Sequence, residues 1–166
     1  MGAKILKYKF KKQIKIIPFG DQHLGSPNCD VSYLKSIIKI ICNSDDTYCI
    51  LLGDFFDMAL KNSVSSVYDS TTTPGKALLE GAKLLKPLAD KGKILAILDG
   101  NHEWRLTKET GICVGQVLAE LLGIPETYST STAILHITIG KRKLNTHCFL
   151  LCLSCTRILQ RAQFFD

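Results

Sequence analysis

The sequence contains no long hydrophobic run. None of its apolar stretches approaches the ~20 residues that a membrane-spanning helix needs, and no apolar segment of the usual length follows the basic N-terminus, as it would in a secretory signal peptide. Internal repeats and low-complexity linkers are absent as well. We therefore expect a cytoplasmic protein without membrane association. Its 166 residues suit one ordinary domain or a piece of a larger one.

Residues 1–20 include no acidic residue. Six lysines there equal the whole net charge of +6, namely Lys4, Lys7, Lys9, Lys11, Lys12 and Lys15. Leu6, Tyr8 and Phe10 alternate with lysines as in an edge strand, where lysines discourage pairing with another chain. Alternatively, the lysines form a patch that attracts phosphates, which favours a nucleic-acid partner.

Strand-like and helix-like patterns alternate along residues 4–139. The predicted strands are residues 4–10, 14–19, 48–52, 93–98 and 133–139, and the predicted helices are residues 31–42, 74–90 and 111–122. Asp30 is placed to cap the first helix, Pro74 suits the first turn of the second, and Gly123 ends the third. Residues 61–73 are rich in Ser and Thr and predict a loop. The alternation predicts an α/β fold with a mainly parallel sheet flanked by helices.

Three polar clusters follow three of these predicted strands. They are Asp21-Gln22-His23, Gly53-Asp54-Phe55-Phe56-Asp57 and Gly100-Asn101-His102-Glu103. A single cluster of this kind is usually a turn, a helix cap or a loop. Three of them, each at the carboxyl end of a strand, indicate one site, because ligands bind at that edge of open α/β sheets.

The residue types in the clusters suit divalent metals. Carboxylate oxygens and imidazole nitrogens bind Mn, Fe or Zn, and the two oxygens of Asp54 could bridge two ions. Asn101 offers an amide oxygen. Two metals about 3.5–4 Å apart can hold a phosphate and activate a water. His102 could then donate a proton to the leaving group, oriented by Asp57.

The order of the clusters resembles the calcineurin-like metallophosphoesterase superfamily. Its leading motifs are Asp-x-His, Gly-Asp-x-x-Asp and Gly-Asn-His-Asp/Glu, and all three are complete within residues 14–140. The neighbouring residues resemble phage or prophage-type members. The resemblance implies an α-β-β-α sandwich, of which residues 1–140 would form the N-terminal half. It also implies two divalent metal ions (Mn, Fe, Zn or Mg) and a phosphate-ester substrate.

The resemblance also implies a role for each metal-binding residue. Asp21 and His23 would hold the first metal, Asp54 would bridge both metals, and Asn101 would bind the second. The later His motifs of the superfamily are missing, and His136 and His147 are the remaining candidates to replace them. Four ligands for two metals leave both sites open, which predicts weak metal binding.

The remaining motif residues would act on the substrate. By the same resemblance, His102 protonates the leaving oxygen or contacts the phosphate, and Asp57 holds it. Arg105 would touch the substrate phosphate, unless it is an ordinary surface arginine. Trp104 would stack on a base or pack near the site. The resemblance thus implies hydrolysis of a phosphomonoester or phosphodiester by a metal-activated water.

Residues 141–166 follow a different pattern, with poor periodicity for either helix or strand. We expect the reading frame to depart from the family near residues 141–145, through a frameshift or truncation. Cys148, Cys152 and Cys155 have the spacing of the iron–sulfur motif in radical S-adenosylmethionine enzymes. With His147 they could instead form a small zinc site, or the cysteine-rich tail could be accidental.

Seven cysteines without a secretion signal indicate reduced thiols. Cys42, Cys49 and Cys113 lie in apolar segments and are expected in the core. The chain has residues for little more than one sheet of the two-sheet sandwich that the resemblance implies. The alternative function is therefore a catalytically incompetent fragment or binding module, which would use its unfinished sheet face to bind a partner.

Overall fold

The computed structural model of the chain describes residues 3–58, 71–140, 146–152 and 155–161, with side chains for the first two ranges. Most of the loop predicted at residues 61–73 lies outside the described residues, as does the predicted departure at residues 141–145. No helix in the described part of the chain is long and apolar enough to cross a membrane.

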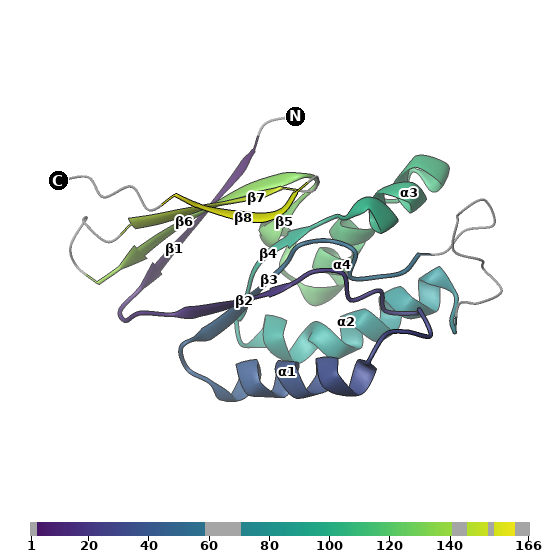
Figure 1. The fold of residues 1–166 in the computed structure, drawn as a ribbon, viewed down its shortest axis with the longest axis horizontal. Coiled ribbons are helices and arrows are strands. Elements are labelled where there is room, and N and C mark those ends of the chain that lie inside the picture. The colour runs from purple at the N-terminus through teal and green to yellow at the C-terminus, as the bar shows by residue number, and fades with distance from the viewer. Residues whose placement is uncertain (1–2, 59–70, 141–145, 153–154, 162–166) are drawn as a thin grey trace.

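Strands and helices alternate along the chain (Figure 1). The strands are β1 (Lys4–Phe10), β2 (Lys15–Phe19), β3 (Thr47–Leu51), β4 (Ile94–Leu98), β5 (Tyr128–Ser129), β6 (Thr132–Ile139), β7 (Thr146–Cys152) and β8 (Cys155–Arg161). The helices are α1 (Val31–Asn43), α2 (Pro74–Asp90), α3 (Asn101–Thr110) and α4 (Val114–Leu122), with a 3-10 turn at Pro125–Thr127.

The strands form two sheets. Strands β2, β3, β4 and β5 make a wholly parallel sheet in that order, called the parallel sheet below. Strand β1 pairs in parallel with β6, and β7 and β8 follow β6 in antiparallel fashion to form the mixed sheet, β1-β6-β7-β8. The predicted α/β class, with mainly parallel pairing and flanking helices, is confirmed.

The presence of a second sheet corrects the prediction of little more than one. Strand β6 does not join the parallel sheet. It pairs with β1, where Leu6 lies opposite Leu135, and short β5 occupies the place beside β4. Strands β7 and β8 form where the sequence pattern predicted no regular structure. Pairing with a neighbouring strand, rather than local periodicity, defines these two strands.

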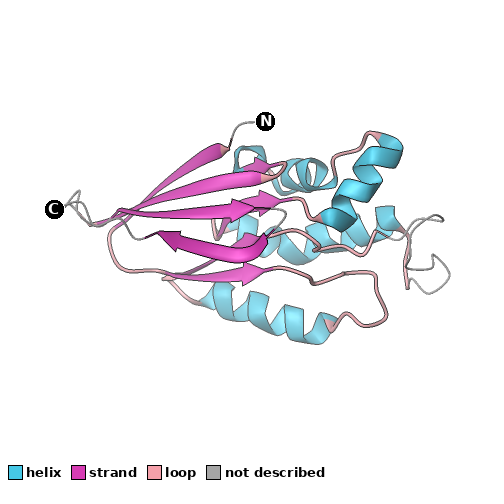
Figure 2. Ribbon diagram, turned by 45° about the horizontal axis from the view of Figure 1, so that its top comes forward, coloured by secondary structure: helices cyan, strands magenta, loops and turns pink. Residues whose placement is uncertain are grey.

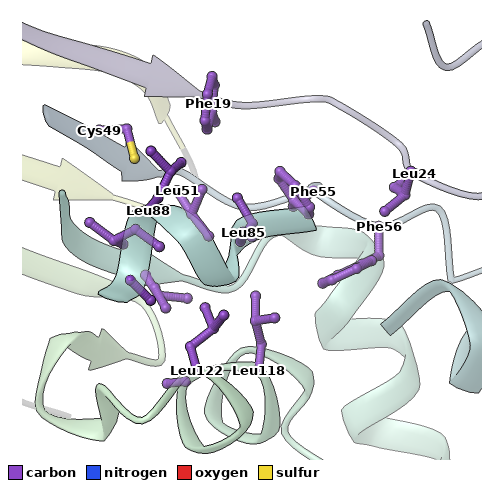
Figure 3. Close-up of a cluster of buried hydrophobic side chains, with 14 of the residues drawn as sticks. Phe19, Leu24, Cys49, Leu51, Phe55, Phe56, Leu85, Leu88, Leu118 and Leu122 are labelled. Atoms are coloured by element: carbon purple, nitrogen blue, oxygen red, sulfur yellow. The ribbon is translucent and has the colours of Figure 1, made fainter. Parts of the chain in front are cut away.

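The buried side chains form two clusters on opposite faces of the parallel sheet. Helices α1, α2 and α4 cover one face, where Leu51, Leu85 and Leu118 pack together (Figure 3). The other face packs against the mixed sheet, through residues such as Ile50 and Leu135. Side chains alternate along β3 between the two clusters, as strand geometry requires. In the described part of the chain, no helix covers the outer face of the mixed sheet (Figures 1 and 2).

The predicted helix signals are found where the sequence placed them. The Asp30 carboxylate accepts a hydrogen bond from the Tyr33 backbone N–H at 2.8 Å and caps α1. Pro74 begins α2, and Gly123 ends α4 in the left-handed conformation. Helix α3, however, was missed. The sequence predicted no helix between residues 98 and 111 and one helix over residues 111–122, whereas α3 occupies Asn101–Thr110 and α4 begins at Val114.

The prediction for the cysteines is confirmed in part. Cys49 is buried, whereas Cys42 and Cys113 are only partly buried. The cysteines of residues 148–155 lie in β7 and β8, but their side chains and that of His147 fall outside the described side chains. The iron–sulfur and zinc interpretations of these residues therefore stay predictions.

Candidate metal centre

The three polar clusters follow three neighbouring strands of the parallel sheet. Strands β2, β3 and β4 lie side by side and point the same way, so the segments after them begin at one edge. Backbone hydrogen bonds join the first two segments. The Asp21 N–H donates to the Gly53 carbonyl at 3.3 Å, and the His23 N–H donates to the Asp54 carbonyl at 3.0 Å.

Several backbone conformations at this edge are unusual for residues with side chains. Asp21, His23, Asp54 and Met58 have φ angles of 55°, 48°, 50° and 45°. This left-handed region costs a residue other than glycine about 1–3 kcal/mol, and such residues cluster at functional sites. Three of the four residues are predicted metal ligands. The backbone therefore turns sharply where these side chains leave the strand ends.

The glycines of the second and third clusters allow the two segments to touch. A Cβ atom on Gly53 would lie 2.4 Å from the Cα of Gly100. A Cβ atom on Gly100 would lie 2.2 Å from the backbone nitrogen of Asp54. Neither position has room for a side chain, and Gly53 also has a φ of 91°. The Gly-Asp and Gly-Asn motifs thus bring Asp54 close to the start of α3.

His102 is held by Asp57. Its Nδ1 atom is hydrogen-bonded to the Asp57 carbonyl oxygen and lies 3.5 Å from Oδ1 of the same residue. Because a carbonyl oxygen can only accept, the hydrogen-bond network assigns the proton to Nδ1. Nε2 is then an acceptor, and Nη2 of Arg105 lies 3.3 Å from it. The pair predicted from the sequence is therefore in contact.

Both oxygens of the Asp54 carboxylate have hydrogen-bond partners. Oδ1 accepts from the His102 backbone N–H at 2.8 Å. With the Asn101 amide oriented to satisfy both of its groups, its nitrogen donates to Asp54 Oδ2 at 2.7 Å. Its oxygen then accepts from Arg105 Nη2 at 3.0 Å. Arg105 thus contacts two of the motif residues and is no ordinary surface arginine.

His23 lies between two carboxylates. Its Nε2 is 3.9 Å from Asp21 Oδ1, and its Nδ1 is 3.8 Å from Asp57 Oδ1. Its ring meets the ring of His102 edge to face, with centroids 4.5 Å apart. The first cluster therefore reaches the side chains of the second and the third.

The structure brings the predicted metal ligands together in pairs. Asp21 lies beside His23, and Asp54 lies beside Asn101. In the described residues, one group of three places potential ligand atoms within 4.8 Å of one another: His23, Asp57 and His102. Carboxylate, imidazole and amide donors of this kind fit Mn, Fe, Zn or Mg in type. The donor set therefore suits divalent cations.

His136 does not belong to this set. It lies in β6, on the face opposite to that of buried Leu135 and Ile137, which point toward the parallel sheet. Its side chain therefore points away from the strand ends that carry the clusters. His147 lies in β7, where its backbone pairs with Ile137.

Two buried carboxylates near the site were not predicted from the sequence to be site residues. Glu103, the last residue of the third cluster, is 2% exposed and accepts hydrogen bonds from three backbone N–H groups. Asp99 accepts from the Tyr128 hydroxyl at 2.6 Å and from the Gly115 N–H at 2.8 Å. Burial raises the pKa of each carboxyl, and these hydrogen bonds oppose the shift. Only the Asp/Glu position of the Gly-Asn-His motif gave a signal for Glu103.

Some lysines of the N-terminal segment form a hydrogen bond or an ion pair, and others have exposed side chains. Lys4 Nζ donates to the Tyr128 carbonyl at 2.8 Å, and Lys15 lies 3.4 Å from Asp46. The side chains of Lys7 and Lys9 are exposed, in alternation with the inward-facing residues of β1. The edge-strand interpretation therefore fits β1. A phosphate-binding role for the exposed lysines remains a prediction.

Comparison of the chain with protein-family models, with curated proteins and with solved structures found no match. The resemblance to the metallophosphoesterases therefore rests on the three sequence motifs.

Proposed function

We propose that the chain is a metal-dependent phosphoric-ester hydrolase of the calcineurin-like metallophosphoesterase type. The observation that carries this proposal is the meeting of three motifs at one sheet edge. There, Asp54 contacts both Asn101 and the backbone of His102, and His23 approaches Asp57. Left-handed backbone at the predicted ligands supports the same interpretation.

In this proposal four residues from the three motifs hold the divalent cations. Asp21 and His23 would bind one ion, Asp54 would bridge, and Asn101 would bind the second with its amide oxygen. When bound, such ions lower the pKa of a water and offset phosphate charge. Asn101 must turn its amide oxygen toward the ion, because its nitrogen now donates to Asp54.

His102 would serve as the proton donor. In the structure its Nδ1 is hydrogen-bonded to the Asp57 carbonyl, and its Nε2 faces Arg105. His102 Nε2 would take a proton from the attacking water, whose oxygen bonds to phosphorus, and the nearby Asp57 carboxylate would stabilise the imidazolium. As the P–O bond to the leaving group breaks, the leaving oxygen would take this proton. Arg105 must then release Nε2, because two donors cannot share a hydrogen bond. A phosphate oxygen would be its new acceptor.

The substrate would be a phosphomonoester or a phosphodiester. Arg105 provides one cation at the site, and Lys7 and Lys9 add exposed positive charge on β1. A net charge of +6 favours polyanionic substrates such as nucleic acid.

The test is hydrolysis of bis-p-nitrophenyl phosphate with added Mn²⁺, together with metal analysis of the purified chain. Asp54→Asn should abolish the metal-dependent rate. Asp90→Asn is the matched control, since Asp90 is an exposed carboxylate paired with Lys86 on α2. Activity that survives in Asp54→Asn would contradict the proposed mechanism.

The outer face of the mixed sheet favours a second candidate, a binding module without catalytic activity. Ile5 is 58% exposed on β1, and its partner in register, Ile134, is partly exposed on β6. Ile5 and Ile134 thus form an exposed apolar pair on a face that also carries Lys7 and Lys9, and exposed apolar surface can mark an interface or an aggregation hazard. A metal-free chain that self-associates in size-exclusion chromatography would favour this candidate. A monodisperse chain with bound metal would favour the hydrolase.

A further inference from the structure

Glu103 joins two segments that are far apart in the sequence. Its Oε2 accepts hydrogen bonds from the backbone N–H groups of Asp54 at 2.9 Å and Gly100 at 2.8 Å. Its Oε1 accepts from the N–H of Phe56 at 3.0 Å. Glu103 is therefore bonded both to the segment after β3 and to the start of α3.

These bonds go beyond ordinary helix capping. A glutamate at the third position of a helix often accepts from the backbone N–H of the capping residue, which here is Gly100. Capping needs no contact with another strand end. The Asp54 and Phe56 N–H groups belong to the segment after β3, where the ladder of the sheet has already ended at Leu51.

A carboxylate is the group that this position requires. Three N–H donors converge on it, and an ionised carboxylate accepts hydrogen bonds with both oxygens and donates none. A glutamine would turn an N–H₂ group toward at least one of these donors. The carboxyl group is also enclosed, because Glu103 is 2% exposed.

The contact is reciprocal. Glu103 accepts from the backbone of Asp54, while the Asp54 carboxylate accepts from the backbone of His102 at 2.8 Å. Asp54 has a left-handed φ of 50°, a conformation that persists only where surrounding contacts hold it. Two of those contacts are the hydrogen bond to Glu103 and the closely packed Gly100.

We propose that Glu103 is a positioning residue of the metal centre, which fixes the backbone of Asp54 against the start of α3 so that Asp54 and Asn101 face the same cation. This inference rests on the proposed metal-dependent function. Glu103 itself touches neither metal nor substrate. It acts through Asp54 and Gly100.

Asp99 offers a matched control. It is as deeply buried as Glu103 and has the same carboxyl group, which also binds backbone, through the Gly115 N–H. Its other partner is the Tyr128 hydroxyl, so its hydrogen bonds lead away from the segment of Asp54. Asp99→Asn and Glu103→Gln therefore make the same chemical change in two buried carboxylates, one just before α3 and one within it.

The experiment measures the Mn²⁺ concentration that gives half-maximal phosphodiester hydrolysis, and Mn²⁺ affinity by calorimetry. Loss of a residue that orients a metal ligand typically weakens metal affinity by about 10- to 100-fold, so Glu103→Gln should raise both constants by at least about tenfold. Asp99→Asn should change them by less than about twofold. At saturating Mn²⁺, the KM of Glu103→Gln for the phosphodiester should stay near that of the wild type.

Equal Mn²⁺ affinity in Glu103→Gln and wild type would overturn the inference and leave the proposed hydrolase function intact. A loss of Mn²⁺ affinity in Asp99→Asn as large as that in Glu103→Gln would do the same. A wild-type chain that binds no Mn²⁺ would overturn both. If Glu103→Gln does not fold, amide hydrogen exchange of the wild type replaces it. The Asp54 and Gly100 amides should then be protected, and more so with Mg²⁺. Exchange as fast as in exposed amides would overturn the inference.

Discussion

The carboxylate of Asp54 and the backbone of His102 are joined by a hydrogen bond of 2.8 Å across the gap between two strand ends. Asp54 therefore caps the first turn of α3, in addition to its predicted role as the bridging metal ligand. Replacing Asp54 by alanine removes both functions at once. A substitution that separates them is more informative.

Asp54→Asn should separate capping from metal binding. The asparagine keeps a side-chain oxygen for the His102 N–H but loses the negative charge that a cation needs. Its new amide nitrogen faces Asn101, which can turn its own amide oxygen toward it. We expect its free energy of unfolding to stay within about 1 kcal/mol of the wild-type value, while Asp54→Ala loses about 1–2 kcal/mol with the cap. Urea unfolding measures the first effect and Mn²⁺-dependent hydrolysis the second. Equal instability of the two variants would show that the hydrogen bond to His102 does not stabilise α3.

His102→Gln should reduce turnover without removing the metal. Loss of a positioned proton donor typically lowers the rate by about 10²–10⁴-fold. Asp57→Asn should lower it less, because it removes the carboxylate 3.5 Å from Nδ1 but keeps the backbone carbonyl that holds the ring. Mn²⁺ affinity, measured by calorimetry, should remain within a few-fold of wild type. A large loss of affinity would instead make His102 a ligand of the His23–Asp57–His102 group.

Gly53→Ala should destabilise the fold. The added Cβ would lie 2.4 Å from the Gly100 Cα, and the φ of 91° is itself unfavourable for alanine. Because the collision is with backbone, we expect a loss of about 2–4 kcal/mol in the free energy of unfolding. Gly75→Ala is the matched control. Gly75 lies in α2 with open space around its Cα, so alanine should be neutral or add up to about 1 kcal/mol.

Much of the parallel sheet could be predicted from local pattern. Apolar runs followed by polar clusters defined β2, β3 and β4, and parallel pairing then placed the three clusters at one edge. Helix α3 could not be recognised in this way. Only Glu103 among its side chains is buried, so no apolar periodicity marks it. Its start is fixed by Asp54, a residue 48 positions earlier in the chain.

The contacts between the site residues were harder to predict from the sequence than the identities of these residues. The motifs supplied Asp21, His23, Asp54, Asn101 and His102. The left-handed backbone at Asp21, His23 and Asp54 could not be predicted from the sequence, because aspartate and histidine indicate a positive φ much less strongly than glycine does. The three bonds of Glu103 likewise depend on which strand ends become neighbours. Tertiary pairing, not local propensity, decides that.

Tyr8 links the two sheets by a hydrogen bond. The hydroxyl of Tyr8, on β1 of the mixed sheet, donates a hydrogen bond to the Leu95 carbonyl on β4 of the parallel sheet. Tyr8→Phe removes this donor and keeps the ring, so we expect a loss of about 1 kcal/mol in the free energy of unfolding at neutral pH. Tyr33→Phe is the control, because Tyr33 is 63% exposed on α1 and its substitution should have no measurable effect.

The same residue should make the fold sensitive to alkaline pH. Burial, followed by the nearby charge of Glu126, raises the pKa of Tyr8 from 10.0 to about 12. Between these values the folded state keeps the Tyr8 proton that the unfolded state has released. The free energy of unfolding therefore falls as pH rises through this window. Urea unfolding at pH 9, 10 and 11 should show a smaller decline in Tyr8→Phe than in wild type or Tyr33→Phe. Parallel declines in all three proteins would mean that the Tyr8 hydroxyl is not buried at the junction.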